Sequence, residues 1–421
     1  MFNTVSVIGL GYIGLPTAAV FASRKKRVIG VDVNDEAVQT INRGEIHIVE
    51  PELDMLVHAA VKGGYLRATT RPEPADAFLI AVPTPFTEGH KPDLAYIEQA
   101  CKSIAPVLAK GNLIVLESTS PVGTTEQVAG WLAALRPDLS FPQQAGEASD
   151  IRVAHCPERV LPGKVLRELV ENDRVIGGMT KACSHAAERL YRVFVQGECV
   201  LTDARTAEMC KLAENSFRDV NIAFANELAT ICERLGINAW ELIALANRHP
   251  RVNILQPGPG VGGHCIAIDP WFIVDAAPEQ ARIIRQARTV NDERPLQVVS
   301  QVDKVLAQWQ AQHGQRQAKV AFLGLSYKAN IDDVRSSPAL TIVNTVAMKY
   351  PDLVLAVEPH LAAAPAELHP NAQFVELQEA LQRADILVLL VAHKDFQSVR
   401  LSNNVNQAVL DTCGAWKGIA I

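Results

Sequence analysis

Three features of this 421-residue sequence predict an α/β protein with two doubly wound parallel-sheet domains joined by a long helix. A glycine-rich turn follows the first apolar strand and opens a helix. Apolar runs of strand length then alternate with helical stretches, which is typical of a parallel sheet covered on both faces. Near the C-terminus the opening pattern returns in degenerate form. We expect three domains, covering residues 1–202, 203–312 and 313–421.

The first strand, residues 5–8, leads into Gly9, Gly11 and Gly14 and then into a helix, and the next strand ends at Asp32. This is the full context of a Rossmann dinucleotide fingerprint. The glycines permit a tight turn and a close approach of pyrophosphate to the helix N-terminus, and the acid accepts from a ribose 2′-hydroxyl. A carboxylate repels a 2′-phosphate, so the sequence favours NAD over NADP.

Composition narrows the functional class. A net charge of −6 gives no basic field, so neither nucleic acid nor a membrane surface is an expected partner. The eight cysteines lack CxxC and zinc-type spacings, which predicts reduced thiols, no disulfides and no metal site. We expect a cytoplasmic protein without a signal peptide, because the N-terminus leads directly into a strand and the apolar runs are too short to span a bilayer.

Two polar segments follow predicted strands of the first sheet. The segment from Glu117 to Thr125 follows the strand at 113–116 and is rich in hydroxyl groups, and Glu158 lies in a segment after another apolar strand. Ligand groups lie at the carboxyl ends of such strands. The hydroxyls also suit a turn or helix cap, and Glu158 also suits a solvated turn.

A long helix is predicted from about Thr206 to Leu235, stopped by Gly236. It carries Lys211 and Asn215 one turn apart and Arg218 near the same face, a pattern that also fits a solvated face. A helix of this length between two sheet domains suggests a structural spine and a dimer surface. Two further helices are predicted at 278–293 and 296–312.

Cys265 follows a glycine run that starts at Gly258, and Asp269 lies four residues beyond it. Glycine tolerates positive φ and admits close ligand approach, so this loop is suited to presenting a thiol. A lone cysteine is otherwise most often a small buried hydrophobe.

The last domain echoes the first, with Phe322–Ser326 parallel to Val7–Gly11, but it lacks the complete glycine fingerprint. We therefore expect it to bind something other than a dinucleotide. Lys328 and Arg335 are available for phosphate, and an ion pair of Arg335 with the neighbouring aspartates is the alternative.

In order along the chain, these motifs resemble the nucleotide-diphosphate-sugar 6-dehydrogenases, the family typified by UDP-glucose dehydrogenase. The matching pieces are GxGYIGLP, VPTPF, ESTSPVGTT, CPERVLPG, the helix of Lys211 and Asn215, GPGVGGHCIAID and the segment Lys328–Pro338. The forms of the Glu158 and Cys265 motifs resemble the branch that oxidises UDP-N-acetylhexosamines. UDP-N-acetyl-D-mannosamine is the expected substrate, with the glucosamine and galactosamine epimers as alternatives.

The resemblance implies a four-electron oxidation of the C6 alcohol to a carboxylate with two NAD⁺. Cys265 would form a thiohemiacetal and then a thioester. Asp269 and Lys211 would hold the water that takes the first proton, Lys211 and Asn215 would stabilise the oxyanion, and Glu158 with Thr119 would assist hydrolysis. The alternatives are a two-electron hydroxy-acid dehydrogenase and a non-catalytic sensor. The retained Cys265 and Lys211 argue against the sensor.

The resemblance also implies binding residues. Arg251 would reach the sugar nucleotide of a neighbouring subunit, so a homodimer or larger homo-oligomer is expected, and the product would supply a surface polysaccharide such as enterobacterial common antigen. Departures from the family pattern occur at Pro162, Ala267, Tyr327, Ala329 and Ser336. The expected NAD contacts are Gly9, Gly11, Tyr12, Ile13, Gly14, Asp32, Thr84 and Thr125, and the expected substrate contacts are Arg159, Val160, Lys211, Asn215, Arg218, His249, Arg251, Gly262, Lys328 and Arg335.

Overall fold

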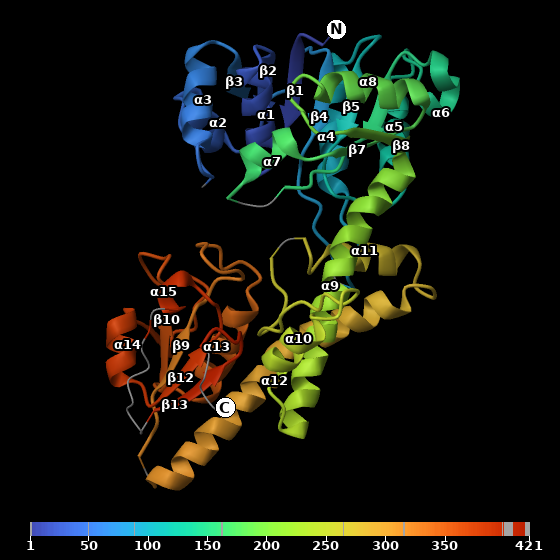
Figure 1. The fold of residues 1–421 in the computed structure, drawn as a ribbon. Helices are drawn as coiled ribbons and strands as arrows, with labels where there is room; N and C mark the ends of the chain where they lie inside the picture. Colours follow the sequence, from blue (N-terminus) through green and yellow to red (C-terminus); the bar gives the residue numbers. More distant parts are fainter. Residues whose placement is uncertain are drawn as a thin grey trace. The chain divides into compact units, whose positions relative to one another are not determined.

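The computed structural model describes residues 2–48, 50–87, 89–160, 163–263, 265–314, 316–397, 399 and 407–416. The chain divides into two compact units, Met1–Glu214 and Asn215–Ile421. Each unit contains its own sheet, so the predicted α/β class with two sheets is confirmed (Figure 1). In the described ranges, no helix has both the length and the apolar composition needed to cross a membrane.

The first unit is built on an eight-stranded sheet with the order β3-β2-β1-β4-β5-β6-β7-β8. Its centre is parallel, with β1 between β2 and β4. The strands are β1 (Thr4–Ile8), β2 (Arg27–Val31), β3 (Leu66–Thr69), β4 (Ala77–Ile80), β5 (Leu113–Leu116), β6 (Arg152–His155), β7 (Arg174–Gly178) and β8 (Cys199–Asp203).

One pair of this sheet departs from the predicted parallel arrangement. β6 and β7 pair antiparallel, whereas β7 and β8 are again parallel. A parallel pair needs a crossover that returns the chain to the starting end of the first strand. Residues 156–173, with the short helix α7 (Val165–Glu171), instead lead into β7 from the end where β6 stops. The sequence pattern did not distinguish a parallel crossover from this antiparallel connection, because both contain a helical stretch.

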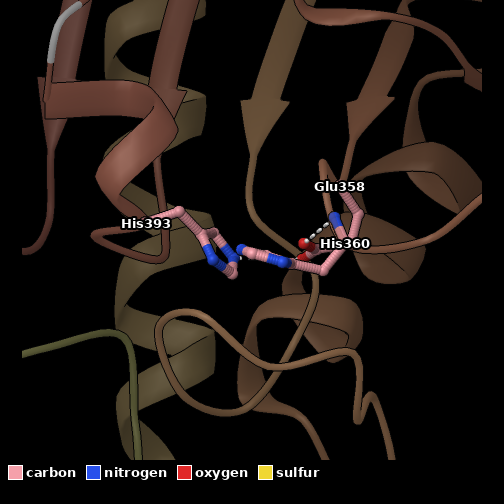
Figure 2. A group of neighbouring side chains, drawn as sticks. All are labelled: Glu358, His360 and His393. Carbon is pink, nitrogen blue, oxygen red and sulfur yellow. Dashed lines mark hydrogen bonds and ion pairs between the residues drawn. The ribbon is translucent and has the colours of Figure 1, made fainter.

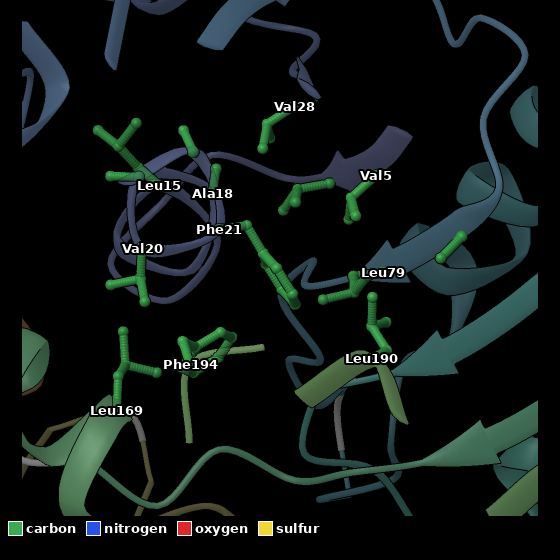
Figure 3. Close-up of a cluster of buried hydrophobic side chains, with 14 of the residues drawn as sticks. Val5, Leu15, Ala18, Val20, Phe21, Val28, Leu79, Leu169, Leu190 and Phe194 are labelled. Atoms are coloured by element: carbon green, nitrogen blue, oxygen red, sulfur yellow. The ribbon is translucent and has the colours of Figure 1, made fainter. Parts of the chain in front are cut away.

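Helices cover both faces of the first sheet. One face buries Phe21, Leu79, Leu190 and Phe194 in a cluster shared with α1, α3 and α8 (Figure 3). The other face packs Ile97 and other apolar residues of α4 and α5 on the opposite sides of the same strands. The helices of this unit are α1 (Gly14–Ser23), α2 (Asp35–Asn42), α3 (Leu53–Lys62), α4 (Ala95–Ile104), α5 (Thr124–Leu135), α6 (Pro142–Ala145), α7 and α8 (Lys181–Tyr191), with 3₁₀ turns η1 (Ala105–Val107) and η2 (Gly146–Ala148).

The predicted long helix is present as α9, Ala204–Leu235. Gly236, with φ +69°, directly follows its last residue and stops it as predicted. The boundary between the two units falls inside α9. The helices that follow are α10 (Ala239–Ala246), α11 (Asp269–Ala276) and α12 (Arg282–His313).

The predicted break before residue 296 is wrong, because α12 is one continuous helix with Pro295 in its interior (Figure 1). Proline removes one helical hydrogen bond and crowds the carbonyl four residues earlier. Packing on both sides of Pro295 offsets that cost, since Arg288 and Val302 are both buried. Tertiary burial of the helix face therefore overrides the local signal of the proline.

The second unit contains a five-stranded sheet with the order β11-β10-β9-β12-β13, and all of its pairs are parallel. The C-terminal half of α12 and α13 cover one face, and α14 packs on the other. The elements are β9 (Val320–Leu323), α13 (Pro338–Lys349), β10 (Val354–Val357), β11 (Ala372–Phe374), α14 (Leu377–Arg383), β12 (Ile386–Leu389), α15 (Lys394–Gln397) and β13 (Ala408–Asp411).

The internal echo between the two sheets is confirmed at the turn after each first strand. Gly9 and Gly324 both have φ above +90°. The next residue in each case donates its backbone N–H to an acid at the end of the neighbouring strand: Leu10 to Asp32, and Leu325 to Glu358, both at 2.8 Å. The same strand–turn–acid unit was therefore built twice.

Candidate active site

The first glycine turn has the geometry of a dinucleotide cradle. A side-chain carbon at Gly9 would lie 2.6 Å from the carbonyl oxygen of Ala81, and one at Gly14 would lie 1.8 Å from that of Gly9. Gly11, in contrast, has no atom within 4 Å of that position. The outer glycines thus close the turn, and Gly11 leaves open space for a ligand. No side chain caps α1, and the N–H of Leu15 bonds to the carbonyl of Gly11 at 3.1 Å. Pro16 has no N–H, so among the first three helical residues only Gly14 keeps an N–H that an anion could use.

Asp32 is held in place by the same turn. Its Oδ2 accepts the N–H of Leu10 at 2.8 Å, and its Oδ1 accepts the N–H of Asn34 at 2.9 Å. The side chain of Asp32 is half-buried, and Tyr12 in the glycine turn is 40% exposed. A carboxylate oriented in this way at the end of β2 fits a ribose diol.

Hydroxyl groups of the segment after β5 mainly form hydrogen bonds to nearby backbone carbonyls. Ser118 donates to the carbonyl of Val82 at 2.7 Å, and Thr124 donates to that of Pro121 at 2.7 Å. The alternative of a turn cluster therefore accounts for these two groups. Thr119 is half-buried, and its hydroxyl has no hydrogen-bond partner among the described residues, which leaves it available to a ligand.

Thr125 and Thr84, both expected at the cofactor, differ in their surroundings. Thr125 is buried, and its hydroxyl donates to Glu208 of α9 at 2.6 Å. The same carboxylate accepts the N–H groups of Gly123 and Thr125, at 2.6 and 2.7 Å, and so caps α5. Burial raises the pKa of Glu208. The Thr84 hydroxyl is inaccessible and has no hydrogen-bond partner within the described ranges.

Glu158 lies in a buried charged cluster rather than in a solvated turn. Its carboxylate is 2.9 Å from the guanidinium of Arg174 and accepts the N–H of Arg159 at 2.7 Å. Arg174 lies over the Tyr191 ring, whose hydroxyl donates to Glu117 at 2.6 Å. Burial raises the pKa of Glu117 to about 7.

Sequence reasoning missed Glu117, Arg174 and Tyr191 as neighbours of Glu158. One signal was present: Arg174 starts an apolar strand, and a charge there requires a buried partner. The adjacent thiol of Cys156 is not a second nucleophile, because burial raises its pKa to about 12.

Three further expected residues of the first unit are Arg159, Val160 and Lys211. Arg159 forms a two-pronged pair with Glu214, at 2.6 and 3.1 Å. Val160 is half-buried against the core, and Lys211 is partly exposed one turn before Asn215.

In the second unit, Asn215 and Asp269 are in direct contact. The amide of Asn215 donates to Asp269 at 2.5 Å, and both side chains are buried. Asp269 begins α11, and the N–H groups of Ile268 and Asp269 bond back to the carbonyl of Cys265, at 3.0 and 2.9 Å. Cys265 is exposed at this turn. The alternative of a buried cysteine is therefore wrong for Cys265, whose role as a nucleophile stays a prediction. His264 lies outside the described residues.

The glycines before Cys265 are required by close packing more than by ligand approach. A side-chain carbon at Gly262 would lie 2.5 Å from the carbonyl oxygen of Ser336, and one at Gly263 would lie 2.9 Å from the Tyr327 ring. The loop that carries the thiol is therefore packed against the segment expected to bind phosphate.

That segment, which follows β9, presents its cations differently. Lys328 is exposed, whereas Arg335 forms a two-pronged ion pair with Asp333, at 2.9 and 2.7 Å. The structure thus shows the alternative for Arg335, an ion pair with a neighbouring aspartate. Ser336 has φ +51°, an uncommon backbone conformation for a residue other than glycine.

Arg218, His249 and Arg251 are exposed. The N–H of Arg251 donates to Nδ1 of His249 at 3.3 Å, in the loop after α10. The polar groups of these residues thus reach solvent in the single chain.

Glu358, His360 and His393 form a group whose possible ligand atoms lie within 4.8 Å of one another (Figure 2). Nδ1 of His393 accepts the N–H of Asn330 at 2.9 Å, so the proton is on Nε2 and is directed to Glu358 at 3.2 Å. This tautomer leaves His393 no lone pair for a metal. Glu358 also accepts from the loop after β9, so the group supports that loop.

Three family models match the chain in order. They are the NAD binding domain, the central domain and the UDP binding domain of the UDP-glucose/GDP-mannose dehydrogenase family, at residues 3–195, 205–293 and 321–418.

Full-length relatives agree with this match. The chain is 65% identical over 415 residues to an NDP-N-acetyl-D-galactosaminuronic acid dehydrogenase of Ralstonia nicotianae, covering 99% of this chain and 96% of that protein. It is 62% identical over 418 residues to the UDP-N-acetyl-D-mannosamine dehydrogenase of Yersinia pestis, covering 99% and 100%. The solved UDP-D-ManNAc dehydrogenase of Pyrococcus horikoshii superposes with a TM-score of 0.89 at 39% identity, covering 99% and 97%.

Proposed function

Because this chain belongs to the UDP-glucose/GDP-mannose dehydrogenase family, we propose that it oxidises UDP-N-acetyl-D-mannosamine at C6 to the uronate with two NAD⁺. Membership makes it an NAD-dependent nucleotide-sugar dehydrogenase, an oxidoreductase. The observation that carries the four-electron proposal is Cys265, the one exposed cysteine of the eight, all of which are described. A two-electron dehydrogenase has no use for such a thiol.

Two groups of relatives, named for different sugars, bear on the identity of the substrate. Those named for UDP-N-acetyl-D-mannosamine are 60–62% identical over the full chain. A relative named for N-acetyl-D-galactosaminuronic acid is 65% identical. The galactosamine epimer is therefore the second candidate substrate, ahead of the glucosamine epimer.

The residues of the first glycine turn fit NAD, since Gly11 leaves space and Asp32 is oriented for a ribose diol. Bound NAD⁺ would supply the hydride acceptor for both oxidations. In the first oxidation the C6 hydrogen leaves as hydride, and we assign the proton of the C6 hydroxyl to a water held by Asp269 and Lys211. The buried Asn215–Asp269 hydrogen bond orients that carboxylate.

In the second oxidation, the Cys265 thiolate adds to the C6 aldehyde and forms a thiohemiacetal. Loss of hydride from C6 converts it to a thioester, and water then releases the carboxylate and the thiol. Lys211 would stabilise the oxyanions electrostatically, together with Asn215. Glu158 would assist the hydrolytic water, and Thr119 would orient it. The guanidinium of Arg174, 2.9 Å from the Glu158 carboxylate, fixes the position of that side chain.

We also propose that the active assembly is a homodimer. Four apolar side chains on α9, spaced close to a heptad repeat, are 45–69% exposed: Phe217, Phe224, Ile231 and Leu235. An apolar stripe of this kind on one helix fits a second copy of the same helix. Arg251 is exposed, as a residue that reaches a neighbouring subunit must be.

We place the reaction in the cytoplasm, where NAD⁺ and sugar nucleotides are available. An acidic amino-sugar nucleotide would supply a bacterial surface polysaccharide such as enterobacterial common antigen. This assignment is supported by the resemblance to the bacterial relatives alone.

The test is the number of NADH molecules formed per sugar consumed. Purified enzyme receives NAD⁺ and one of the three UDP-N-acetylhexosamine epimers, with Cys265→Ser as the matched variant. Two NADH per sugar with the mannosamine epimer alone supports the proposal. Two with the galactosamine epimer corrects the substrate, and full activity of Cys265→Ser overturns the thioester route.

A further inference from the structure

The loop that carries Cys265 begins at Gly258, and both polar groups of this residue are held by buried side chains. Its N–H donates to Oδ1 of Asn226 at 2.9 Å, and its carbonyl accepts from Nε of Arg294 at 3.0 Å. Asn226 is 1% exposed and Arg294 is 3% exposed. Asn226 lies on α9 and Arg294 on α12, so Gly258 is fixed to both helices of the second unit.

Asn226 is itself fixed by a buried polar network, whereas Arg294 is held by Thr230 and Gln297, at 3.3 and 3.2 Å. Asn226 donates to Asn291 at 3.0 Å, and Asn291 donates to the carboxylate of Asp219 at 2.9 Å. Arg288 pairs with the same carboxylate at 2.5 Å. Four polar side chains, each nearly inaccessible, thus join α9 to α12.

The loop is also confined beyond Gly258. A side-chain carbon at Gly260 would lie 2.8 Å from Pro338 and 3.2 Å from Pro295, the proline inside α12. Gly262 and Gly263 pack on the next segment in the same manner, and the chain then turns at Cys265 into α11. At Gly258, in contrast, no atom lies within 4 Å of a side-chain carbon, and the position of the residue is set by its two hydrogen bonds.

We propose that Asn226 and Arg294 are positioning residues for Cys265, acting through the Gly258 peptide. The inference rests on the proposed role of Cys265 as the nucleophile. Apolar side chains would pack α9 on α12 at least as well, because burying a polar pair costs desolvation. Here the amide and the guanidinium are directed to one peptide of the thiol-bearing loop. A nucleophile displaced by about 1 Å loses on the order of 100-fold in rate.

The experiment compares Asn226→Ala and Arg294→Ala with the control Arg288→Met. The control removes a buried ion pair between α9 and α12 at a side chain whose hydrogen bonds go to Asp219 and Asp292, not to Gly258, Asn226 or Arg294. Asn226→Asp keeps an acceptor for Gly258, and Arg294→Gln keeps a donor, so these serve as rescue variants. For each enzyme we would measure kcat, the KM for NAD⁺, the rate at which iodoacetamide alkylates Cys265, and the urea midpoint.

We expect both Gly258-directed alanine variants to lose roughly 10- to 100-fold in kcat, with the KM for NAD⁺ changed less than about twofold. The Cys265 alkylation rate should change with kcat, and the rescue variants should recover part of both. Arg288→Met should lower the urea midpoint at least comparably but keep kcat within about threefold.

Two outcomes separate the inference from the function on which it rests. If Cys265→Ser still forms two NADH per sugar, the proposed function fails. If Cys265→Ser is inactive but the Gly258-directed variants keep the kcat of Arg288→Met, the positioning role fails alone. If an alanine variant does not fold, the rescue variant at the same position replaces it, because Asn226→Asp and Arg294→Gln still alter the hydrogen bond to Gly258. A kcat and a Cys265 alkylation rate that are both below the wild-type values then support the positioning role, and wild-type values of both overturn it.

Discussion

The guanidinium of Arg174 lies 2.9 Å from the carboxylate of Glu158, and the two side chains are 3% and 7% exposed. Arg174 starts β7, and Glu158 follows β6, the strand that pairs antiparallel with β7. The reversed strand direction therefore brings the start of β7 to the edge where β6 ends. This is the edge of the sheet at which ligands of doubly wound folds bind.

Arg174→Met should destabilise the enzyme by about 3–5 kcal/mol, because it leaves the Glu158 charge buried without its partner. The double variant Arg174→Met/Glu158→Gln should recover most of this loss. Urea unfolding of the single and double variants measures both effects. Equal stabilities of the two would show that Glu158 does not depend on Arg174.

The buried acid Glu117 predicts a pH-dependent stability. Its pKa in the fold is about 7, above the usual value of about 4.3 in an unfolded chain. The folded protein therefore holds this proton over that interval while the unfolded chain has released it. The free energy of unfolding should fall as pH rises from about 4.3 to about 7, by at most about 1.4 kcal/mol per pH unit.

Glu117→Gln should remove this contribution, so its stability relative to wild type should improve steadily from pH 5 to pH 7 and then level off. Urea midpoints across that range provide the measurement. A constant difference between the two proteins at every pH would contradict the raised pKa. Tyr191→Phe is the companion variant, because it removes the hydroxyl that donates to Glu117.

Asp32 should set the preference for NAD⁺ over NADP⁺. Asp32→Ser combined with Val33→Arg removes the repulsive charge and adds a cation at a side chain that is 96% exposed. The ratio of kcat/KM for NAD⁺ to that for NADP⁺ should fall at least 100-fold. Val33→Arg alone is the control, and an unchanged ratio in the double variant would exclude Asp32 from cofactor selection.

Phe224 lies in the exposed stripe of α9, so Phe224→Glu should convert a dimer to a monomer. A charge in an apolar interface is costly to desolvate. Sedimentation velocity measures the mass, and Met348→Glu, a change at another exposed apolar side chain, is the control. A wild-type monomer, or a dimer that survives Phe224→Glu, would count against this interface.

Local signals were sufficient for much of the fold. The Gly9–Gly14 turn, Asp32 and the long helix each depend on residues close together in sequence, and the structure contains all three. The repeated turn at Gly324 was also readable, because the same local geometry needs the same glycine. Pro295 shows the limit of such signals: its local preference is to end a helix, yet burial of α12 on both sides carries the helix through it.

The sequence by itself determined the alternation of strands with helices, the cofactor turn and the glycine loop before the thiol, since period and glycine placement are local properties. Only the tertiary structure decided which groups meet. In the folded chain Arg174 pairs with Glu158, the hydroxyl of Thr125 donates to Glu208, and Gly258 is held by Asn226 and Arg294. These partners lie 16 to 83 residues apart, and a buried charge or amide acquires its partner only when the chain packs.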